Sequence, residues 1–185
     1  RQLFRFHYDG TDHDPYLHQN PKEVYRPVSI FRTTQTHLLQ VRPELPQAIG
    51  CVNYVALGMA DLSVFLPLYE GIRSYPKGTN ESSHESAYWK FRKVQALGMV
   101  DYNRYAPIIK KVYADFEAET DQRQREMEEQ YLAIYQTQPL PARDLLQAFS
   151  DHVLRSALEV TDQLIETLFT HLTIDIQAEY EFHGA

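Results

Sequence analysis

One change of pattern governs what this chain can fold into. Up to about residue 83 the apolar residues come in short β-rich runs separated by turn residues, and from about residue 84 they recur at helical spacing. Strands followed by long helices predict an α+β fold, with a β-rich part at 1–83 and a helical part at 84–185 in one compact unit. The clearest helical pattern is a row at intervals of four and three residues, namely Leu154, Leu158, Thr161, Ile165, Leu168 and Leu172.

The β-rich part is expected to hold three antiparallel strands, of which the last two form a hairpin. Pro67 cannot donate a hydrogen bond to a neighbouring strand, so the strand that contains it should lie at an edge or a bulge. Residues 1–26 are expected to be mostly loop, with a short strand at Leu3–Tyr8. The three predicted strands span 27–41, Cys51–Leu57 and Leu62–Tyr69.

The helical part is expected to hold three helices. The last two should form an antiparallel hairpin packed along the 154–172 row, with Ile165 in the core and Glu128 on a solvated acidic face. A coiled-coil dimer would use the same row, but the short proline-containing connection favours pairing within one chain. The helices run from a capping box at Ser82 and Glu85 to about Tyr102, from a first turn at Pro107 to about Gln136, and from Pro141 to about Phe182.

Charge and composition exclude several classes of function. The net charge is −7, and it is divided into +4 for residues 1–114 and −11 for residues 115–185. An acidic chain without a basic stripe is a poor match for nucleic acid. The acidic half is either a solvated helix surface or a docking face for a basic partner. The sequence has no apolar run long enough for a membrane span and no glycine motif for a nucleotide, so neither a membrane nor a nucleotide is expected as a partner.

The densest group of metal-type ligands lies near the start of the chain. Aspartate and histidine bind divalent cations, but this spacing matches no known metal-binding template, and Asp14-Pro15 is typical of a turn. We therefore expect neither a metal nor another cofactor. The residues of this group are His7, Asp9, Asp12, His13 and Asp14.

Arg32 and Cys51 are the remaining candidates. If residues 27–41 form a strand, Val28, Ile30 and Arg32 share an otherwise apolar face, and Arg32 is expected in the interior. A buried guanidinium needs acceptors, so Arg32 either belongs to a structural ion pair or lines a substrate site, unless it lies at the strand end and reaches water. Cys51 is the only thiol and begins an apolar strand, which is typical of a small apolar residue rather than a nucleophile.

Three segments together resemble the cysteine dipeptidases of the N-terminal-nucleophile hydrolase superfamily, the dipeptidase A group to which secernins are distantly similar. They are Gly10–Tyr16, Tyr25–Pro43 and Val55–Tyr69. The resemblance implies an αββα sandwich, of which this chain would supply the C-terminal portion. It also implies a dipeptide substrate and a nucleophilic cysteine at the N-terminus of the mature enzyme, with its own α-amino group as the base.

This chain starts with Arg1, so the resemblance places the nucleophile outside it and predicts that the chain alone is inactive. No catalytic residue is then expected here, and Arg32 stays the candidate for substrate binding or site support. The expected partners are the missing N-terminal part of the enzyme and its dipeptide substrates. The enzyme is expected in the cytoplasm, and assembly into a homo-oligomer is one of the possibilities. The alternative is a non-enzymatic helical interaction module whose acidic hairpin docks a partner.

Overall fold

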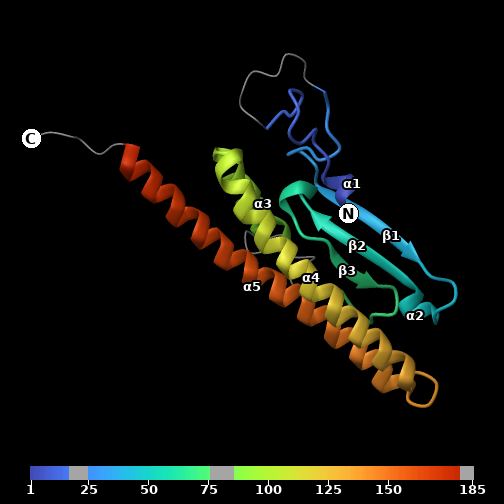
Figure 1. Ribbon diagram of the computed structural model, residues 1–185. Helices are drawn as coiled ribbons and strands as arrows, with labels where there is room; N and C mark the ends of the chain where they lie inside the picture. The colour runs from blue at the N-terminus through green and yellow to red at the C-terminus, as the bar shows by residue number, and fades with distance from the viewer. Residues whose placement is uncertain (17–24, 76–85, 180–185) are drawn as a thin grey trace, which may run out of the picture.

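The computed structural model describes residues 1–16, 25–75 and 86–179, and it has the predicted α+β fold. A three-stranded antiparallel sheet lies beside a long helical hairpin, with the N-terminal segment at one end of the sheet (Figure 1). The elements are α1 (Gln2–Arg5), β1 (Gln35–Val41), α2 (Gln47–Gly50), β2 (Cys51–Leu57), the 3₁₀ helix η1 (Ala60–Leu62), β3 (Leu66–Tyr69), α3 (Ala87–Val100), α4 (Tyr102–Ile134) and α5 (Pro139–Glu179).

The strand order is β1-β2-β3, so Pro67 lies on an edge strand, as predicted. Strand β3 is shorter than expected because Leu62 ends η1 and residues 63–65 are neither helix nor strand. Because side chains alternate along a strand, one face of the sheet carries the buried residues Val52, Tyr54 and Ala56 and turns toward the helices. The other face carries Leu39 and Val41, which remain 72% and 68% exposed.

Two strand predictions near the N-terminus are wrong. Residues 2–5 form α1 rather than part of a strand at Leu3–Tyr8. Residues 27–34 are not a strand either, because Ser29 is the residue held inside: its backbone N–H donates to the Phe6 carbonyl at 3.1 Å, and its hydroxyl accepts from the Asp61 N–H at 2.8 Å. Val28 is consequently 52% exposed.

Helices α3 and α4 are separated by a single residue, Asp101, whose carboxylate accepts a hydrogen bond from the Arg104 N–H at the start of α4. Helix α4 therefore begins five residues earlier than predicted, and Pro107 falls in its second turn instead of its first. The predicted capping box at Ser82 and Glu85, the 83/84 boundary and the predicted helix end at Phe182 lie outside the described residues.

Helices α4 and α5 form the predicted antiparallel hairpin within one chain (Figure 1). The row of α5 residues predicted to face α4 coincides only partly with the buried face of the helix. Leu154, Thr161 and Leu168 are buried, but Leu158, Ile165 and Leu172 are only half-buried. The buried stripe runs instead through Val153, Ala157, Thr161, Leu164 and Leu168. None of the helices in the described part of the chain combines the length and the apolar character needed to cross a bilayer.

The face of α4 that meets the sheet is polar, and the expectation for Glu128 is wrong. Its carboxylate accepts two hydrogen bonds from Arg42, at 2.6 and 2.8 Å, and one from the Tyr69 hydroxyl. One turn earlier, the Gln124 amide donates to the hydroxyls of Tyr54 and Tyr69, at 3.1 and 2.8 Å. Long polar side chains thus join the sheet to this part of the hairpin, beside the apolar contacts of the core.

The turn after β2 depends on a glycine. Gly58 has a φ of +76°, and a Cβ there would lie 2.2 Å from the Gln95 side-chain oxygen. Gln95 is fully buried in α3; its oxygen accepts from the Met59 N–H at 3.0 Å, and its amide donates to the Leu57 carbonyl at 2.9 Å. This side chain fastens the turn to α3 and so places η1 against the C-terminal half of α3 and the first turns of α4.

Two neighbouring residues of α5 test the position of the buried stripe. Leu168 is 1% exposed, so Leu168→Ala should lower the free energy of unfolding by about 2–5 kcal/mol. Phe169 is 60% exposed, so Phe169→Ala should change it by no more than about 0.5 kcal/mol. Urea denaturation of both variants is the measurement, and a larger loss for Phe169→Ala would contradict the described orientation of α5.

Candidate functional site

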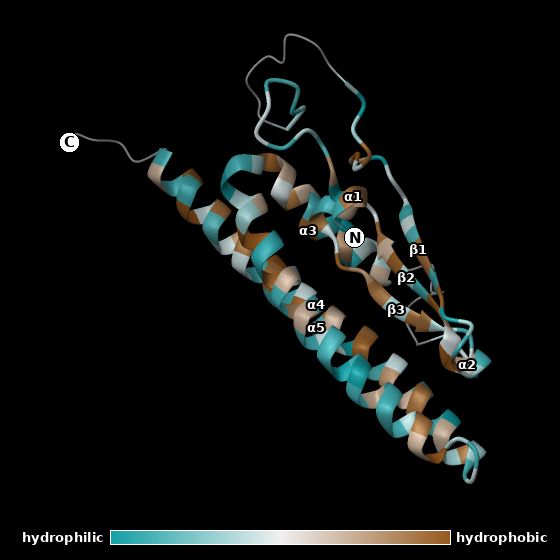
Figure 2. Cartoon of the chain, turned by 45° about the vertical axis from the view of Figure 1, so that its right-hand side comes forward, coloured by the Kyte–Doolittle hydropathy of each residue, from teal (hydrophilic) through white to brown (hydrophobic). Residues whose placement is uncertain are grey.

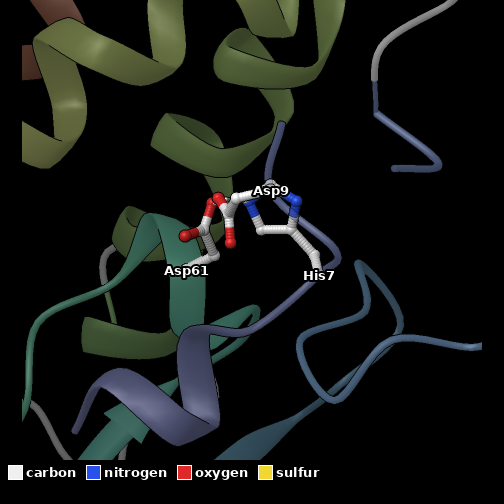
Figure 3. Close-up of side chains that lie close together, drawn as sticks. All are labelled: His7, Asp9 and Asp61. Atoms are coloured by element: carbon white, nitrogen blue, oxygen red, sulfur yellow. Dashed lines mark ion pairs between the residues drawn. The ribbon is translucent and has the colours of Figure 1, made fainter. Parts of the chain in front are cut away.

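Buried ionisable groups gather where the N-terminal segment, η1 and the start of α4 meet. His7 is 1% exposed and lies at the centre of this group, with Asp9 and Asp14 on its own segment and Asp61 in η1. Figure 3 shows the imidazole of His7 and the carboxylates of Asp9 and Asp61 turned toward one another. We call His7, Asp9, Asp14, Asp61, Tyr102 and Lys110 the His7 cluster.

Each ring nitrogen of His7 has a carboxylate partner. Nε2 lies 2.6 Å from an Asp9 oxygen, and Nδ1 lies 3.1 Å from an Asp14 oxygen. A carboxylate only accepts hydrogen bonds, so this geometry suits an imidazolium that donates from both nitrogens. Burial lowers the pKa of His7, but the hydrogen bond with Asp61 and the charges of Asp61, Asp9 and Asp14 outweigh it, and the net effect raises the pKa.

Asp61 is the most constrained carboxylate of the cluster. It accepts a short hydrogen bond from the Tyr102 hydroxyl and pairs with the Lys110 ammonium at 2.9 Å. Burial raises the pKa of Asp61, yet the hydrogen bonds from His7, Tyr102 and Lys110 more than compensate and lower it. Burial and the Asp61 charge raise the pKa of Tyr102 strongly, so Tyr102 stays a neutral hydrogen-bond donor.

An aromatic wall closes one side of the cluster. Tyr16 meets the His7 ring edge-on at a centroid distance of 5.1 Å, and Tyr102 does so at 5.4 Å. The Tyr16 hydroxyl donates to the Ser29 carbonyl at 2.7 Å. Burial, with the Asp61 charge, raises the pKa of Tyr16 to about 12. Both tyrosines therefore shield the ion pairs from water and keep their own protons near neutral pH.

The other side of the cluster opens into a pocket of about 410 Å³. Asp9 and Lys110 are the accessible charged members of the cluster there, with side chains 55% and 35% exposed. Residues lining the pocket include Arg5, Asp9, Asp61, Ser63, Lys110 and Tyr113. The pocket thus presents both an anion and a cation to solvent.

His7, Asp9 and Asp61 are close enough to share a metal ion, because their ligand atoms all lie within 4.8 Å of one another. The place of a cation is, however, taken by this chain itself: the Lys110 ammonium lies 2.9 Å from Asp61 and 3.7 Å from Asp9. His7 can bind a metal only after losing its proton, which the three carboxylates oppose. The chemistry of this donor set fits an internal ion-pair network better than a metal site.

A second buried carboxylate, Glu117 of α4, pairs with Arg5, which lines the same pocket. It accepts from the Arg5 guanidinium at 2.5 and 3.2 Å and from the Phe65 N–H at 2.8 Å. Arg5 also donates to the Ala60 and Ser63 carbonyls, at 3.3 and 3.0 Å. Glu117 and Arg5 together fix α1, the η1 turn and the start of β3 against α4.

The structure brings together only part of the predicted ligand group. His7, Asp9 and Asp14 meet, as their sequence proximity suggests, but Asp12 is exposed and the His13 ring packs edge-on against Tyr25 at 4.7 Å. Sequence reasoning missed Asp61, Tyr102 and Lys110. The sequence marks only Asp61 as unusual, because it is a lone charge in an apolar run. Tyr102 and Lys110 lie in a helix 95 and 103 residues away from His7 along the chain, so no local pattern connects them with it.

Arg32 does not point into the interior. It lies in a turn, is exposed, and lines a shallow pocket with Tyr16, Tyr25 and Phe31. The argument from strand alternation is wrong because residues 27–34 are not a strand, although a role for Arg32 in a substrate site stays a prediction. Cys51 begins β2, half-buried on the sheet face turned away from the helices, in register with Val41.

Comparison with known proteins identifies the family. The model of peptidase family C69 matches residues 1–115. The chain belongs to peptidase family C69. The match contains the sheet, α3 and the whole His7 cluster, and it ends inside α4, before Glu117.

Curated relatives agree with this assignment. The chain is 56% identical over 81 residues to a probable dipeptidase of Salmonella dublin, covering 44% of this chain and 19% of the relative. It is 33% identical over 106 residues to a probable dipeptidase A of Streptococcus pyogenes, covering 54% and 22%. It is 29% identical over 108 residues to dipeptidase A of Lactobacillus helveticus, covering 55% and 23%. The chain thus spans about a fifth of the length of these relatives.

The charge state of His7 predicts a pH dependence of stability. A histidine whose pKa is raised on folding stabilises the folded state fully below its ordinary pKa of about 6.5, and this contribution is lost as pH rises through the higher value. The free energy of unfolding, measured in urea between pH 6 and 9, should therefore fall more steeply in the wild type than in His7→Gln. His37→Gln, on an exposed residue, should keep the wild-type slope; equal slopes in all three proteins would contradict a charged His7.

Removal of the Glu117 charge should destabilise the chain. Glu117→Gln leaves the Arg5 guanidinium buried without its counter-ion, which costs about 3 kcal/mol. Asp115→Asn is the matched control on the same helix, because its pair with Lys111 is exposed, and it should change stability by no more than about 0.5 kcal/mol. Similar losses in both variants, measured by urea denaturation, would show that the Arg5–Glu117 pair is not a principal contact.

Proposed function

We propose that this chain is part of a dipeptidase of the cysteine type. The observation that carries the proposal is the family match over residues 1–115, which is supported by relatives whose names are dipeptidase and dipeptidase A. Hydrolysis of a peptide bond by this route needs an activated thiolate and a base beside it. We assign both to an N-terminal cysteine in a part of the enzyme outside this chain.

The surroundings of Cys51 support that assignment. Its register partner on β1 is Val41, an aliphatic residue that can take no proton; on the β3 side its carbonyl accepts from the N–H of Glu70, an acidic residue whose carboxylate is held by the Gln47 amide. The charged groups of the His7 cluster are engaged with one another and come from the N-terminal segment, η1 and α4. In the described part of the chain the strand neighbours of Cys51 are thus an aliphatic and an acidic residue rather than a histidine, and the role of the His7 cluster in this proposal is to hold the N-terminal segment against the helices.

The outer face of the sheet is the surface that we assign to the rest of the enzyme. Leu39 and Val41 are largely exposed there, and Cys51, Leu57 and Leu68 on the same face are half-buried. Full burial of an aliphatic side chain contributes about 1.5–3 kcal/mol. A second layer packed on this face would complete an αββα sandwich, and the relatives are long enough to supply it.

Arg32 and the cellular location belong to the same proposal. Arg32 is a solvent-facing guanidinium beside aromatic rings, so it is available to bind a carboxylate when the missing part is present. We place the enzyme in the cytoplasm.

The assay for this proposal is dipeptide hydrolysis, followed by chromatography of the released amino acids. The 185-residue chain alone should give no turnover above the uncatalysed rate, and joining it to the upstream part of a C69 dipeptidase should give turnover. Cys51→Ala should leave the activity of the joined enzyme unchanged. Turnover by the chain alone would overturn the proposal, and loss of that turnover in Cys51→Ala would identify Cys51 as the nucleophile.

A further inference from the structure

Helix α5 carries an apolar row that the rest of the chain leaves partly uncovered. Ile165, Phe169, Leu172 and Ile176 follow one another at intervals of four, three and four residues, so they lie on one face of the helix. Ile165 and Leu172 are half-buried against the core, whereas Phe169 and Ile176 are 60% and 49% exposed. The row therefore begins at the edge of the core and continues along α5 toward the C-terminal end of the helix. We call these four residues the α5 row.

The α5 row lies in strongly acidic surroundings. Between Ser156 and Glu179 the helix carries five acidic residues and no lysine or arginine. Asp162 pairs with Lys90 of α3, and Asp175 pairs with Arg104 of α4. The other three, Glu159, Glu166 and Glu179, are exposed and form no ion pair with another described residue. Their negative charge is thus available to a partner.

The position of the row separates it from the dipeptidase-like part. All four residues lie outside the family match, which ends at residue 115. The last turns of α5 extend past the other helices, and hydrophobic stretches recur along them (Figures 1 and 2). Helix α5 has 41 residues and α4 has 33, so α5 is longer by about 12 Å at 1.5 Å per residue.

We propose that the α5 row is the docking surface for an amphipathic helix of a partner protein, with basic residues beside its apolar stripe. The 4-3-4 spacing is the coiled-coil repeat, whose knobs-into-holes packing requires a helix as the partner. The unpaired carboxylates select lysine and arginine along the edges of that helix. A second copy of α5 fits poorly, because it would bring two acidic helices together. This inference does not depend on the dipeptidase proposal.

Fluorescence anisotropy with a labelled synthetic peptide tests the proposal. The probe is a 21-residue helix with leucine at positions a and d of each heptad and lysine at e and g; the control peptide has glutamate in place of lysine. The 185-residue chain should bind the lysine peptide saturably and more weakly as salt rises, and should bind the glutamate peptide at least ten-fold more weakly. Equal binding of the two peptides, or no binding of either, would overturn the proposal.

Two variants of α5 separate docking on this row from general attraction to an acidic protein. Phe169→Asp should weaken binding of the lysine peptide at least ten-fold, while Ile174→Asp, at 57% exposure on the opposite face, should change it less than two-fold. Both add one negative charge, so charge alone would strengthen binding in both. Circular dichroism checks that both variants fold, and an equal effect on binding would overturn the proposal. A concentration-dependent dimer in sedimentation that Phe169→Asp abolishes would assign the row to a second copy, and would also overturn it.

Discussion

The fold depends most on one buried carboxylate, Glu117. It neutralises Arg5, accepts from the Phe65 N–H, and lies 3.6 Å from the Arg1 guanidinium. Four parts of the chain that are distant in sequence meet there: α1, the η1 turn, the start of β3 and the middle of α4. A buried charge is strongly destabilising when one of its partners is lost. The four parts therefore depend on one another for their positions.

The polar contacts of α4 form a second line of constraint. Lys110, Glu117, Gln124 and Glu128 are spaced by seven, seven and four residues and face the N-terminal segment and the sheet. Hydrogen bonds have fixed directions, whereas apolar packing is non-directional. The polar face thus sets the rotation of α4 about its axis, and the apolar stripe directly beside it then packs against α5.

The fold class could be predicted from the sequence, whereas several local predictions were wrong for physical reasons. Helical spacing predicted the hairpin, and Pro67 predicted an edge strand, because both are local rules. The strand through Arg32 was wrong because a tertiary hydrogen bond between Ser29 and Asp61 overrides the local alternation. Glu128 looked like a solvated charge because its partner Arg42 lies 86 residues away. Only part of the His7 cluster could be predicted from the sequence. Asp9 and Asp14 are sequence neighbours of His7, whereas Tyr102 and Lys110 come close to it only in the folded chain.

Helix α4 runs without a break across the point where the family match ends at residue 115. Its first turns carry Tyr102 and Lys110 of the His7 cluster, and its later turns carry Glu117, Gln124 and Glu128. One inserted residue after 115 would rotate everything beyond it by about 100° and turn those three side chains away from the sheet. Insertions that lengthen the hairpin are therefore compatible with the fold only beyond Glu128, with matching insertions in α5. The spacing from Lys110 to Glu128 is set by contacts with the N-terminal segment and the sheet, not by the connection between α4 and α5.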